Sequence, residues 1–370
     1  MTKIYLIRHA EAEGNLYRRI HGHYDSLVTE RGLRQIDELK KRFEAVEIDA
    51  VYSSDLLRTC KTAEAICVPH KLPLYTDKGL REVNMGVWED KTWGEVEYLT
   101  PEALFAFNND PASWRVEGSE EFFTLQKRLT DTIAKIAGEN EGKTIAVVSH
   151  GSAIRAFLCG PLNVPPEEIP KVPHCDNTAV ALILYDNGVF DVEYYGDNSH
   201  LSTENSTFAH QRWWKEQTTF DSTNMRYKPF DPETDMEIYA SFRADAGRPA
   251  RSGNDNLSVT IGMIGDVPAG LCELDLERER EDGAGWIELS YMAPEYRRTG
   301  IGVQLIGYAV YVFRGLGRDK LRLEVEEQNE NALFFYTKYG FKSVDEHTAD
   351  GIRLIKMEKD ISRYKKDGSV

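Results

Sequence analysis

Short apolar runs alternate with amphipathic stretches through the first half of the chain. Apolar residues at helical spacing predict helices near Glu30–Phe43, Leu56–Ile66, Glu120–Ala137 and Ser152–Leu158. Runs rich in β-branched residues predict strands at Ile4–Ile7, Ala50–Tyr52, Ile145–Val148, Ala179–Leu184 and Val189–Tyr194. Strands separated by helices in this way are typical of a mainly parallel sheet with helices on both faces.

This alternation fades between Gly196 and Thr223, where Asn, Ser and Thr become frequent. We interpret this stretch as the end of one domain followed by a linker. Trp213 and Trp214 lie within it, and their simplest role is to pack the linker against a domain rather than to bind a partner.

A second periodic pattern begins at Met225. It predicts strands at Met225–Lys228, Leu257–Ile264, Ala269–Asp275, Trp286–Met292, Lys320–Val325 and Arg353–Met357, and helices at Pro232–Asp245, Gly302–Arg314 and Asn331–Tyr339. The expected organisation is therefore a domain at 1–200, a linker at 201–224, a second domain at 225–361 and a tail at 362–370. A length of 370 residues suits two domains.

Charge and cysteine content narrow the possible partners. A net charge of −16 disfavours nonspecific binding of nucleic acid or anionic membranes. No apolar stretch approaches the length of about 18 residues needed to span a membrane, and the N-terminal apolar run is too short for a signal peptide. The five cysteines lack C-x-x-C spacing, so we expect neither disulfides nor zinc, and a cytoplasmic location. The oligomeric state is not readable from the sequence.

Two of the predicted strands end in a histidine. Arg8, His9 and Ala10 follow the first strand, and Ser149, His150 and Gly151 follow the strand that starts at Ile145. Ligands of parallel sheets bind at the carboxyl ends of the strands. The pattern therefore predicts that His9 and His150 share one site, although either histidine alone would more simply be structural.

Five separated motifs surround these histidines. They are LIRHAEAEGN, HGHYDSLVTERG, YSSDLLRTCKTAEAI, LREVNMGVWE and VVSHGSAIRAF. In this order they resemble the histidine phosphatase superfamily, the phosphoglycerate-mutase-like proteins, from Lys3 to about His200. The resemblance implies a three-layer α/β domain of that type with a mainly parallel sheet.

The resemblance also implies roles for individual residues. His9 would be the nucleophile and Glu82 the proton donor, while the phosphate would be bound by Arg8, Asn15, Arg58 and His150. Phosphoryl transfer depends on positioning and on stabilisation of charge, and guanidinium groups suit phosphate oxygens. We expect the two arginines and a protonated His150 to balance the dianion of a small phosphate ester. No metal is implied.

Each of these residues also has an ordinary structural interpretation. Taken alone, Arg58 could be a solvated helix residue, Asn15 a helix cap and Glu82 a surface carboxylate. Two positions depart from the family pattern, since Ala10 replaces the usual Gly and Ala12 a common Thr. The order of the motifs favours the functional interpretation.

The stretch between Glu82 and His150 bears on the reaction type. It has no long insertion of the kind that caps the site of mutases, so hydrolysis is favoured over a mutase-type transfer. It does contain Trp93, Tyr98, Phe105, Phe107 and Trp114, which either roof the pocket or pack helices.

In the second half, a turn with two glycines connects a predicted strand to a helix. Backbone N–H groups at such a turn suit a pyrophosphate, although the same glycines could simply form a tight turn. Together with the downstream LRLEVEEQNENALFFYTKYGF, the turn resembles the GNAT-type N-acetyltransferases over Met225–Glu358. The resemblance implies an α/β domain with a mixed sheet, acetyl-CoA as the donor and an amine as the acceptor.

The acetyltransferase resemblance also assigns residues. Acetyl-CoA would contact Met292, Arg297, Arg298, Thr299, Gly300, Ile301, Gly302 and Asn329. Tyr336 would protonate the departing thiolate, or else pack its helix. The general base stays open between Glu288 and Glu324, either of which could be an exposed strand carboxylate. Asn329 could instead cap a helix.

The sequence therefore predicts a bifunctional enzyme, a phosphatase joined to an N-acetyltransferase. Because the acetyltransferase base is unassigned, the alternative is a phosphatase whose second domain only binds acyl-CoA and regulates its neighbour.

Overall fold

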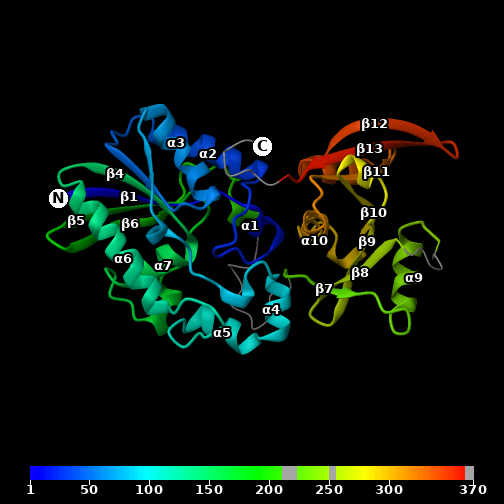
Figure 1. Ribbon diagram of the computed structural model, residues 1–370, viewed down its shortest axis with the longest axis horizontal. Coiled ribbons are helices and arrows are strands. Elements are labelled where there is room, and N and C mark those ends of the chain that lie inside the picture. Colours follow the sequence, from blue (N-terminus) through cyan, green and yellow to red (C-terminus); the bar gives the residue numbers. More distant parts are fainter. Residues whose placement is uncertain (211–222, 250–255, 363–370) are drawn as a thin grey trace. The chain divides into compact units, whose positions relative to one another are not determined.

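The computed structural model describes residues 1–210, 223–249 and 256–362. The chain divides into two compact units, Met1–Asp221 and Ser222–Val370 (Figure 1). Trp213 and Trp214, and the tail from residue 363 onward, lie outside the described residues.

The first unit is built on a sheet in the order β3-β2-β4-β1-β5-β6. Its strands are β1 (Thr2–Arg8), β2 (Ala50–Ser53), β3 (Leu74–Thr76), β4 (Thr144–Ser149), β5 (Val180–Asp186) and β6 (Val189–Asp197). The strands from β3 to β1 are parallel, and β5 and β6 join antiparallel. The predicted mainly parallel sheet is confirmed.

Helices cover both faces of this sheet because side chains alternate along the strands. Tyr5 and Ile7 of β1 join the cluster under α2 (Glu30–Phe43) and α3 (Leu57–His70). Ile4 and Leu6 join the opposite cluster under α6 (Phe122–Glu139) and α7 (Gly151–Cys159). Smaller elements are α1 (Glu13–Tyr17), α4 (Trp93–Leu99), α5 (Pro101–Asn109), α8 (Thr207–His210) and the 3₁₀ turns Lys78–Leu80, Gly86–Trp88 and Pro166–Lys171.

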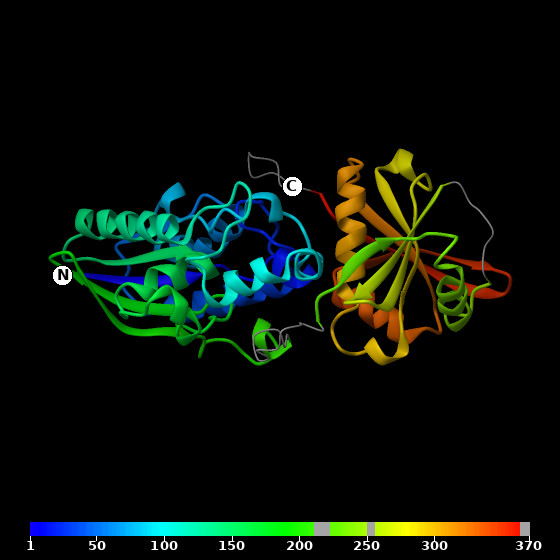
Figure 2. The same cartoon turned by 90° about the horizontal axis from the view of Figure 1, so that it is seen from below.

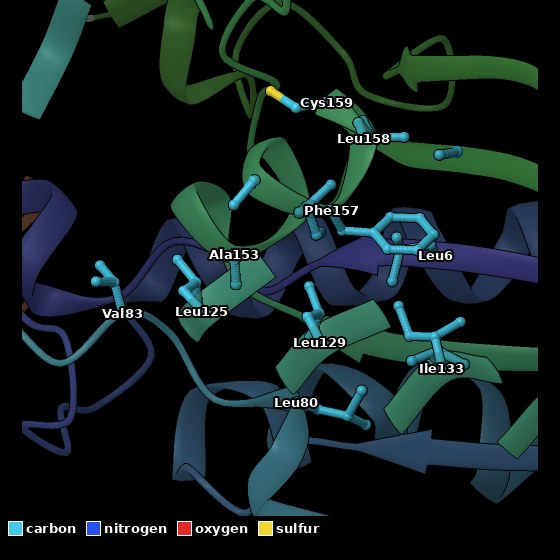
Figure 3. Close-up of a cluster of buried hydrophobic side chains, with 14 of the residues drawn as sticks. Leu6, Leu80, Val83, Leu125, Leu129, Ile133, Ala153, Phe157, Leu158 and Cys159 are labelled. Carbon is cyan, nitrogen blue, oxygen red and sulfur yellow. The ribbon is translucent and has the colours of Figure 1, made fainter. Parts of the chain in front are cut away.

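The cluster under α6 and α7 fixes where α7 begins. Leu129 and Ile133 of α6, Phe157 of α7 and Leu6 of β1 meet in it, all almost fully buried (Figure 3). Each such side chain contributes about 1.5–3 kcal/mol on burial. Because α7 starts directly after β4, this packing holds the helix N-terminus at the carboxyl edge of the sheet.

Part of the stretch predicted as a linker packs on the first unit. The side chain of Gln35 in α2 donates hydrogen bonds to the carbonyl of Asn205 at 2.7 Å and to the hydroxyl of Thr207 at 2.9 Å. Ser202 N donates to Glu38 of the same helix at 3.1 Å. Polar contacts rather than apolar periodicity hold this segment, which explains why the hydrophobic pattern fades there.

The second unit is a sheet in the order β12-β13-β11-β10-β9-β8-β7. Its strands are β7 (Arg226–Pro229), β8 (Leu257–Ile264), β9 (Val267–Asp275), β10 (Ala284–Met292), β11 (Lys320–Glu326), β12 (Lys342–Ala349) and β13 (Ile352–Asp360). Strands β10 and β11 are parallel, and the other pairs of described strands are antiparallel. The predicted mixed sheet is confirmed.

Helices α9 (Met236–Asp245) and α10 (Val303–Gly315) lie on opposite faces of this sheet (Figure 2). Gly285 permits the close approach of α10, because a Cβ there would lie 2.1 Å from Cγ of Phe313. The remaining elements are α11 (Glu330–Lys338) and the 3₁₀ turns Arg280–Asp282 and Pro294–Tyr296. Among the described residues, no helix combines the length and the apolar character needed to cross a membrane.

Candidate functional site

The two strand-end histidines meet at the carboxyl edge of the first sheet. Strands β1 and β4 run in parallel with Arg8 opposite Ser149, so the next residues on each strand are neighbours. His9 N donates to the Ser149 carbonyl at 3.0 Å, and the rings of His9 and His150 lie 5.3 Å apart between centroids. The structure thus brings together the two imidazoles that the sequence placed in one site.

Two interactions set the chemical state of His9. Its Nδ1 lies 2.7 Å from the Ala10 carbonyl, and because a carbonyl only accepts, Nδ1 carries the hydrogen. Burial, and then Arg58 and Arg8, hold the pKa of His9 well below its ordinary value. The ring is therefore neutral, with the lone pair on Nε2, as a nucleophile requires.

Arg58 is held in place by backbone oxygens. It lies in the first turn of α3, is 1% exposed, and donates to the carbonyls of His21 at 3.1 Å, Gly22 at 2.8 Å and Tyr24 at 3.0 Å. Burial lowers its pKa from the ordinary arginine value, which still leaves a cation at neutral pH. The solvated-helix interpretation of Arg58 is wrong because the guanidinium is enclosed.

Arg8 lies against the start of α7. A Cβ at Gly151 would stand 3.3 Å from Nε of Arg8, so the glycine makes room for the guanidinium. Nη1 donates to the Cys175 carbonyl, whereas the buried Nε has no acceptor among the described residues. This leaves a donor of a buried cation for an anionic group.

His150 is fully buried, and neither ring nitrogen has a hydrogen-bond partner among the described residues. Burial, and then Arg58 and His9, hold its pKa well below the ordinary value. In the protein alone, burial and neighbouring positive charge leave His150 neutral, and the protonated His150 expected in the complex with a phosphate dianion stays a prediction. A bound dianion would reverse that balance.

Glu82 is attached to the N-terminus of α7. Its carboxylate accepts from Val83 N at 2.9 Å, Ser152 N at 3.0 Å and Ala153 N at 2.8 Å. Helix N-termini favour negative groups through their unpaired N–H groups and dipole. Since His150 directly precedes α7, these bonds hold Glu82 beside the histidine pair.

Asn15 serves as a cap, as its structural interpretation proposed. Its Oδ1 accepts from Ala12 N at 3.0 Å at the start of α1, and Nδ2 of Asn177 lies 3.4 Å from the same oxygen. Asn177 Nδ2 also donates to the His9 carbonyl at 2.9 Å. Asn15 therefore lies beside His9 and Asn177.

Sequence reasoning missed two residues that bond to the backbone of His9 and Ala10. Asn177 just precedes β5, whose antiparallel direction brings its start to the same edge as the ends of β1 and β4. The polar run before that strand was the available signal. Thr62 accepts from Ala10 N at 2.8 Å and donates to the Arg58 carbonyl at 2.6 Å, so it connects the segment after β1 to α3.

The aromatic residues between Glu82 and His150 divide into two groups. Tyr98 and Phe105 are exposed, whereas Trp93, Phe107 and Trp114 pack together with Trp88. Packing therefore accounts for most of this second group's surface. Within residues 1–210, 223–249 and 256–362, no group of three His, Cys, Asp or Glu side chains able to hold a metal ion occurs.

The second unit contains a gap in its sheet. Strands β10 and β11 pair only from Ala284 to Trp286 on β10, so the rest of β10 up to Met292 leaves one edge without β11. An extended ligand with amide groups could bond to that edge. The opening fits the pantetheine arm that acetyl-CoA would present, and the turn before α10 lies just after it.

The turn before α10 has the backbone form that the glycines suggested. Arg298 and Gly300 have positive φ of 62° and 88°, and the Thr299 hydroxyl donates to the Tyr296 carbonyl at 2.7 Å. Ile301 is buried, and Gly302 immediately precedes the helix, where a Cβ would lie 3.3 Å from Cγ of Met292. These features fit a backbone cradle for a pyrophosphate.

Arg297 is engaged elsewhere. Its Nη2 is paired with Asp245 at 2.5 Å, and its Nε donates to the Met292 carbonyl at 2.9 Å. Both members of this ion pair are about half exposed, at 47% and 48%. Arg297 would therefore have to give up a partner to contact a phosphate directly.

Tyr336 and Asn329 both lie on or beside α11. Tyr336 is 8% exposed, and burial raises its pKa to about 12, so the phenol keeps its proton at neutral pH. The ring packs edge-on against Phe335 and Phe341, so Tyr336 has the packing role that the sequence left open. Asn329 caps α11 by accepting from Ala332 N at 3.1 Å.

The two candidate bases share an arginine. Arg278 lies 3.6 Å from a Glu288 oxygen and 3.2 Å from a Glu324 oxygen, and it stacks on Trp286 at 3.4 Å from the ring centroid. Arg248 and His347 lie near the same carboxylates, at 3.7 Å and 3.8 Å. Glu288 and Glu324 thus lie together on either side of one arginine.

Comparisons with known proteins assign each unit to a family. The model of the histidine phosphatase superfamily (branch 1) matches residues 4–198, and that of the acetyltransferase (GNAT) family matches residues 213–341. The GNAT domain implies the use of acetyl-CoA.

Individual relatives match the first unit. Phosphoglycerate mutase-like protein 4 of Arabidopsis thaliana is 32% identical over 204 residues, which are 54% of this chain and 87% of that protein. Phosphoserine phosphatase 1 of Hydrogenobacter thermophilus is 29% identical over 183 residues, 50% of this chain and 86% of that protein. The solved structure of Bacillus stearothermophilus YhfR has a TM-score of 0.53 and 34% identity, covering 54% of this chain and 99% of that one.

Proposed function

We propose, from the premise that the chain belongs to the histidine phosphatase superfamily (branch 1), that its first unit hydrolyses small phosphomonoesters through a phosphohistidine at His9. The second part of the proposal is that its GNAT domain transfers an acetyl group to an amine. The observation that carries the first part is a neutral, buried His9 whose Nδ1–H is fixed at 2.7 Å from a carbonyl, beside Arg8, Arg58 and His150.

In the first step, Nε2 of His9 forms a bond to phosphorus as the ester P–O bond breaks. The departing alkoxide takes a proton from the carboxyl group of Glu82. Arg8 and Arg58 face the nonbridging oxygens, whose charge the transition state spreads. His150 then takes up a proton in response to the dianion and adds a further donor.

In the second step, a water molecule attacks phosphorus and gives a proton to the Glu82 carboxylate. The P–N bond breaks, and inorganic phosphate and neutral His9 result, so the site is restored. Hydrolysis is favoured over transfer to a second hydroxyl because only two short helices, α4 and α5, precede α6 between Glu82 and His150.

The decisive experiment is to trap the phosphoenzyme with an activated aryl phosphate. We expect an acid-labile, base-stable phosphoryl group on His9, release of phosphate, and loss of both in His9→Ala. His347→Ala is the matched control, since this histidine is 44% exposed and lies in the second unit. Phosphate release by His9→Ala at the wild-type rate would refute the assignment.

In the second unit, bound acetyl-CoA supplies a thioester whose carbonyl an amine can attack. The turn from Arg298 to Gly302 would bind the pyrophosphate through its N–H groups, and the free edge of β10 would orient the pantetheine arm. Tyr336 holds a phenolic proton in a buried position from which it can protonate a thiolate.

Calorimetry with acetyl-CoA followed by a panel of amines tests this part. We expect binding, and turnover of at least one amine that falls in Tyr336→Phe while acetyl-CoA affinity stays unchanged. Binding without turnover of any amine would refute acetyl transfer and favour a noncatalytic acyl-CoA-binding module.

A further inference from the structure

The stretch between the two family matches is attached to the first unit. The histidine phosphatase match ends at residue 198 and the GNAT match begins at residue 213, so residues 199–210 belong to neither. These residues are called the connecting segment below. Asn205 and Thr207 within it are only 8% and 2% exposed, so the segment is packed as part of a folded body.

One set of contacts joins the connecting segment to Glu11, two residues after His9. The fully buried Gln35 accepts from Glu11 N at 2.8 Å through its Oε1. Through its Nε2 it donates to the Asn205 carbonyl at 2.7 Å and to the Thr207 hydroxyl at 2.9 Å. The Thr207 hydroxyl in turn donates to the Glu11 carboxylate at 3.2 Å. Both the backbone and the side chain of Glu11 are therefore tied to the segment.

A second set of contacts reaches the His9 carbonyl through Asp176, which is 2% exposed. The Ser206 hydroxyl donates to Oδ2 of Asp176 at 2.6 Å. The other oxygen, Oδ1, accepts from Asn177 N at 2.8 Å and from Phe208 N at 3.4 Å. Because the side-chain amide of Asn177 donates to the His9 carbonyl at 2.9 Å, the segment holds the residue that holds the nucleophile.

His200 provides a third contact. Its Nδ1 lies 3.2 Å from Nη1 of Arg42, and its Nε2 lies 3.1 Å from the hydroxyl of Thr178. Because a guanidinium only donates, Nδ1 accepts and Nε2 carries the hydrogen. Burial, and then Arg42, lower the pKa of His200 to about 4, which keeps the ring neutral at neutral pH. Thr178 passes this contact on, since its hydroxyl donates to the Asn177 carbonyl at 2.7 Å and its N–H to the Arg8 carbonyl at 3.1 Å.

The three sets of contacts end on residues 8, 9 and 11, the stretch that carries the nucleophile. The phosphate cation Arg58 is held differently, by the carbonyls at positions 21, 22 and 24. Attack on phosphorus requires Nε2 of His9 to lie in line with the leaving oxygen, and a misplacement of about 1 Å costs about a hundredfold in rate. Loosening the segment should therefore slow the attack more than it weakens binding of the phosphate.

We propose that the connecting segment positions His9 for phosphoryl transfer. Thr207 acts through Glu11, and Ser206 acts through Asp176. Both are positioning residues, since neither contacts the reacting atoms. The inference rests on the proposed phosphatase function, and it makes residues 199–210 part of the phosphatase rather than a linker between two enzymes.

The test is steady-state hydrolysis of 4-nitrophenyl phosphate by the full-length chain, with near-ultraviolet circular dichroism to establish that each variant is folded. Thr207→Val keeps the shape of the side chain and removes the hydroxyl. We expect kcat to fall at least tenfold while KM changes less than twofold, with a parallel fall in the single-turnover rate of phosphohistidine formation. Thr207→Ser restores the hydroxyl and should keep at least half of the wild-type kcat. Ser206→Ala tests the second set of contacts and should lower kcat at least threefold.

Thr203→Val is the matched control, because it makes the same change at an exposed position of the segment, and its kcat should stay within twofold of the wild type. Wild-type kcat in folded Thr207→Val and Ser206→Ala, or equal losses in Thr207→Ser and Thr207→Val, would overturn the inference. Should Thr207→Val fail to fold, Ser206→Ala decides by the same measure. A wild-type chain that forms no phosphohistidine refutes the proposed function itself, whereas normal wild-type turnover with unaffected variants refutes only the positioning role.

Discussion

Binding of a dianion to the first unit should be coupled to uptake of a proton by His150. In the protein alone, burial and the neighbouring Arg58 and His9 keep His150 neutral, with its pKa far below the ordinary 6.5. A dianion next to the ring favours the charged form. Over the pH range in which His150 is neutral when free and charged in the complex, affinity changes tenfold per pH unit, or about 1.4 kcal/mol.

Sulfate is the suitable probe because it stays a dianion from pH 5.5 to pH 8. We expect its affinity to rise by one to two powers of ten per unit of acidification, since His9 Nε2 can also take a proton. Titration calorimetry in two buffers of different ionisation enthalpy measures the number of protons taken up. Arg58→Met provides the baseline for sulfate bound elsewhere on the chain.

The variant His150→Asn isolates the contribution of this ring. It should bind one proton fewer than the wild type, with a correspondingly shallower pH dependence. The reasoning is refuted if wild type and His150→Asn take up the same number of protons, since then His150 does not change its charge on binding.

Four further outcomes follow from the structure. Thr62→Val leaves the buried Ala10 N–H without its acceptor and should destabilise the first unit by about 2 kcal/mol, whereas Thr62→Ser should cost about 1 kcal/mol. Hydrogen exchange of first-unit peptides in urea measures both losses. A larger loss in Thr62→Ser than in Thr62→Val would contradict this account. The pKa values of His9 and His150 are depressed in the folded state, so the unfolded chain takes up protons first as the pH falls. The first unit should therefore lose stability as the pH falls through about 6.5, by about 1.4 kcal/mol per histidine between pH 7.5 and 5.5. The His9→Gln variant should lose less stability than the wild type over this pH range. An equal loss in both proteins, measured from urea midpoints, would argue against a neutral His9. Arg243→Met leaves the fully buried Glu273 without its partner and should cost about 3–5 kcal/mol in the second unit, whereas replacing both by Met and Leu should recover most of it in the same exchange experiment. Gly302→Ala places a Cβ 3.3 Å from Met292 and should weaken acetyl-CoA binding severalfold by calorimetry, and unchanged affinity would remove this turn from the binding site.

The elements that the sequence predicted are those whose burial follows a simple period. Helix α2 begins and ends where the pattern placed it, because Thr29 caps it by accepting from Gly32 N at 3.0 Å and apolar side chains recur along one face. Strand β12 was missed because all of its residues are exposed, so backbone pairing with β13 defines it without any apolar alternation. Short strand β3 and helices α4 and α5 were missed for a similar reason, since few of their side chains are buried.

In the candidate site, too, some features follow from the strand pattern and others depend on tertiary packing. That His9 and His150 meet follows from two parallel strands, which the sequence predicts. The charge on His150 does not follow, because it depends on how completely the ring is enclosed and on which cations lie nearby. The ion pair of Arg297 with Asp245 joins residues 52 positions apart, so no local sequence pattern predicts it.

The hydrogen bonds that fix Arg58 to backbone carbonyls have a practical consequence for redesign. Backbone oxygens of His21, Gly22 and Tyr24 surround the guanidinium, and a carbonyl offers the same acceptor whatever side chain follows it. A library that randomises positions 23 and 24 therefore changes side chains near Arg58 while the carbonyl acceptors of the cation stay in place. Position 22 has to be left out of such a library, since a Cβ there would stand 2.4 Å from the Val83 carbonyl.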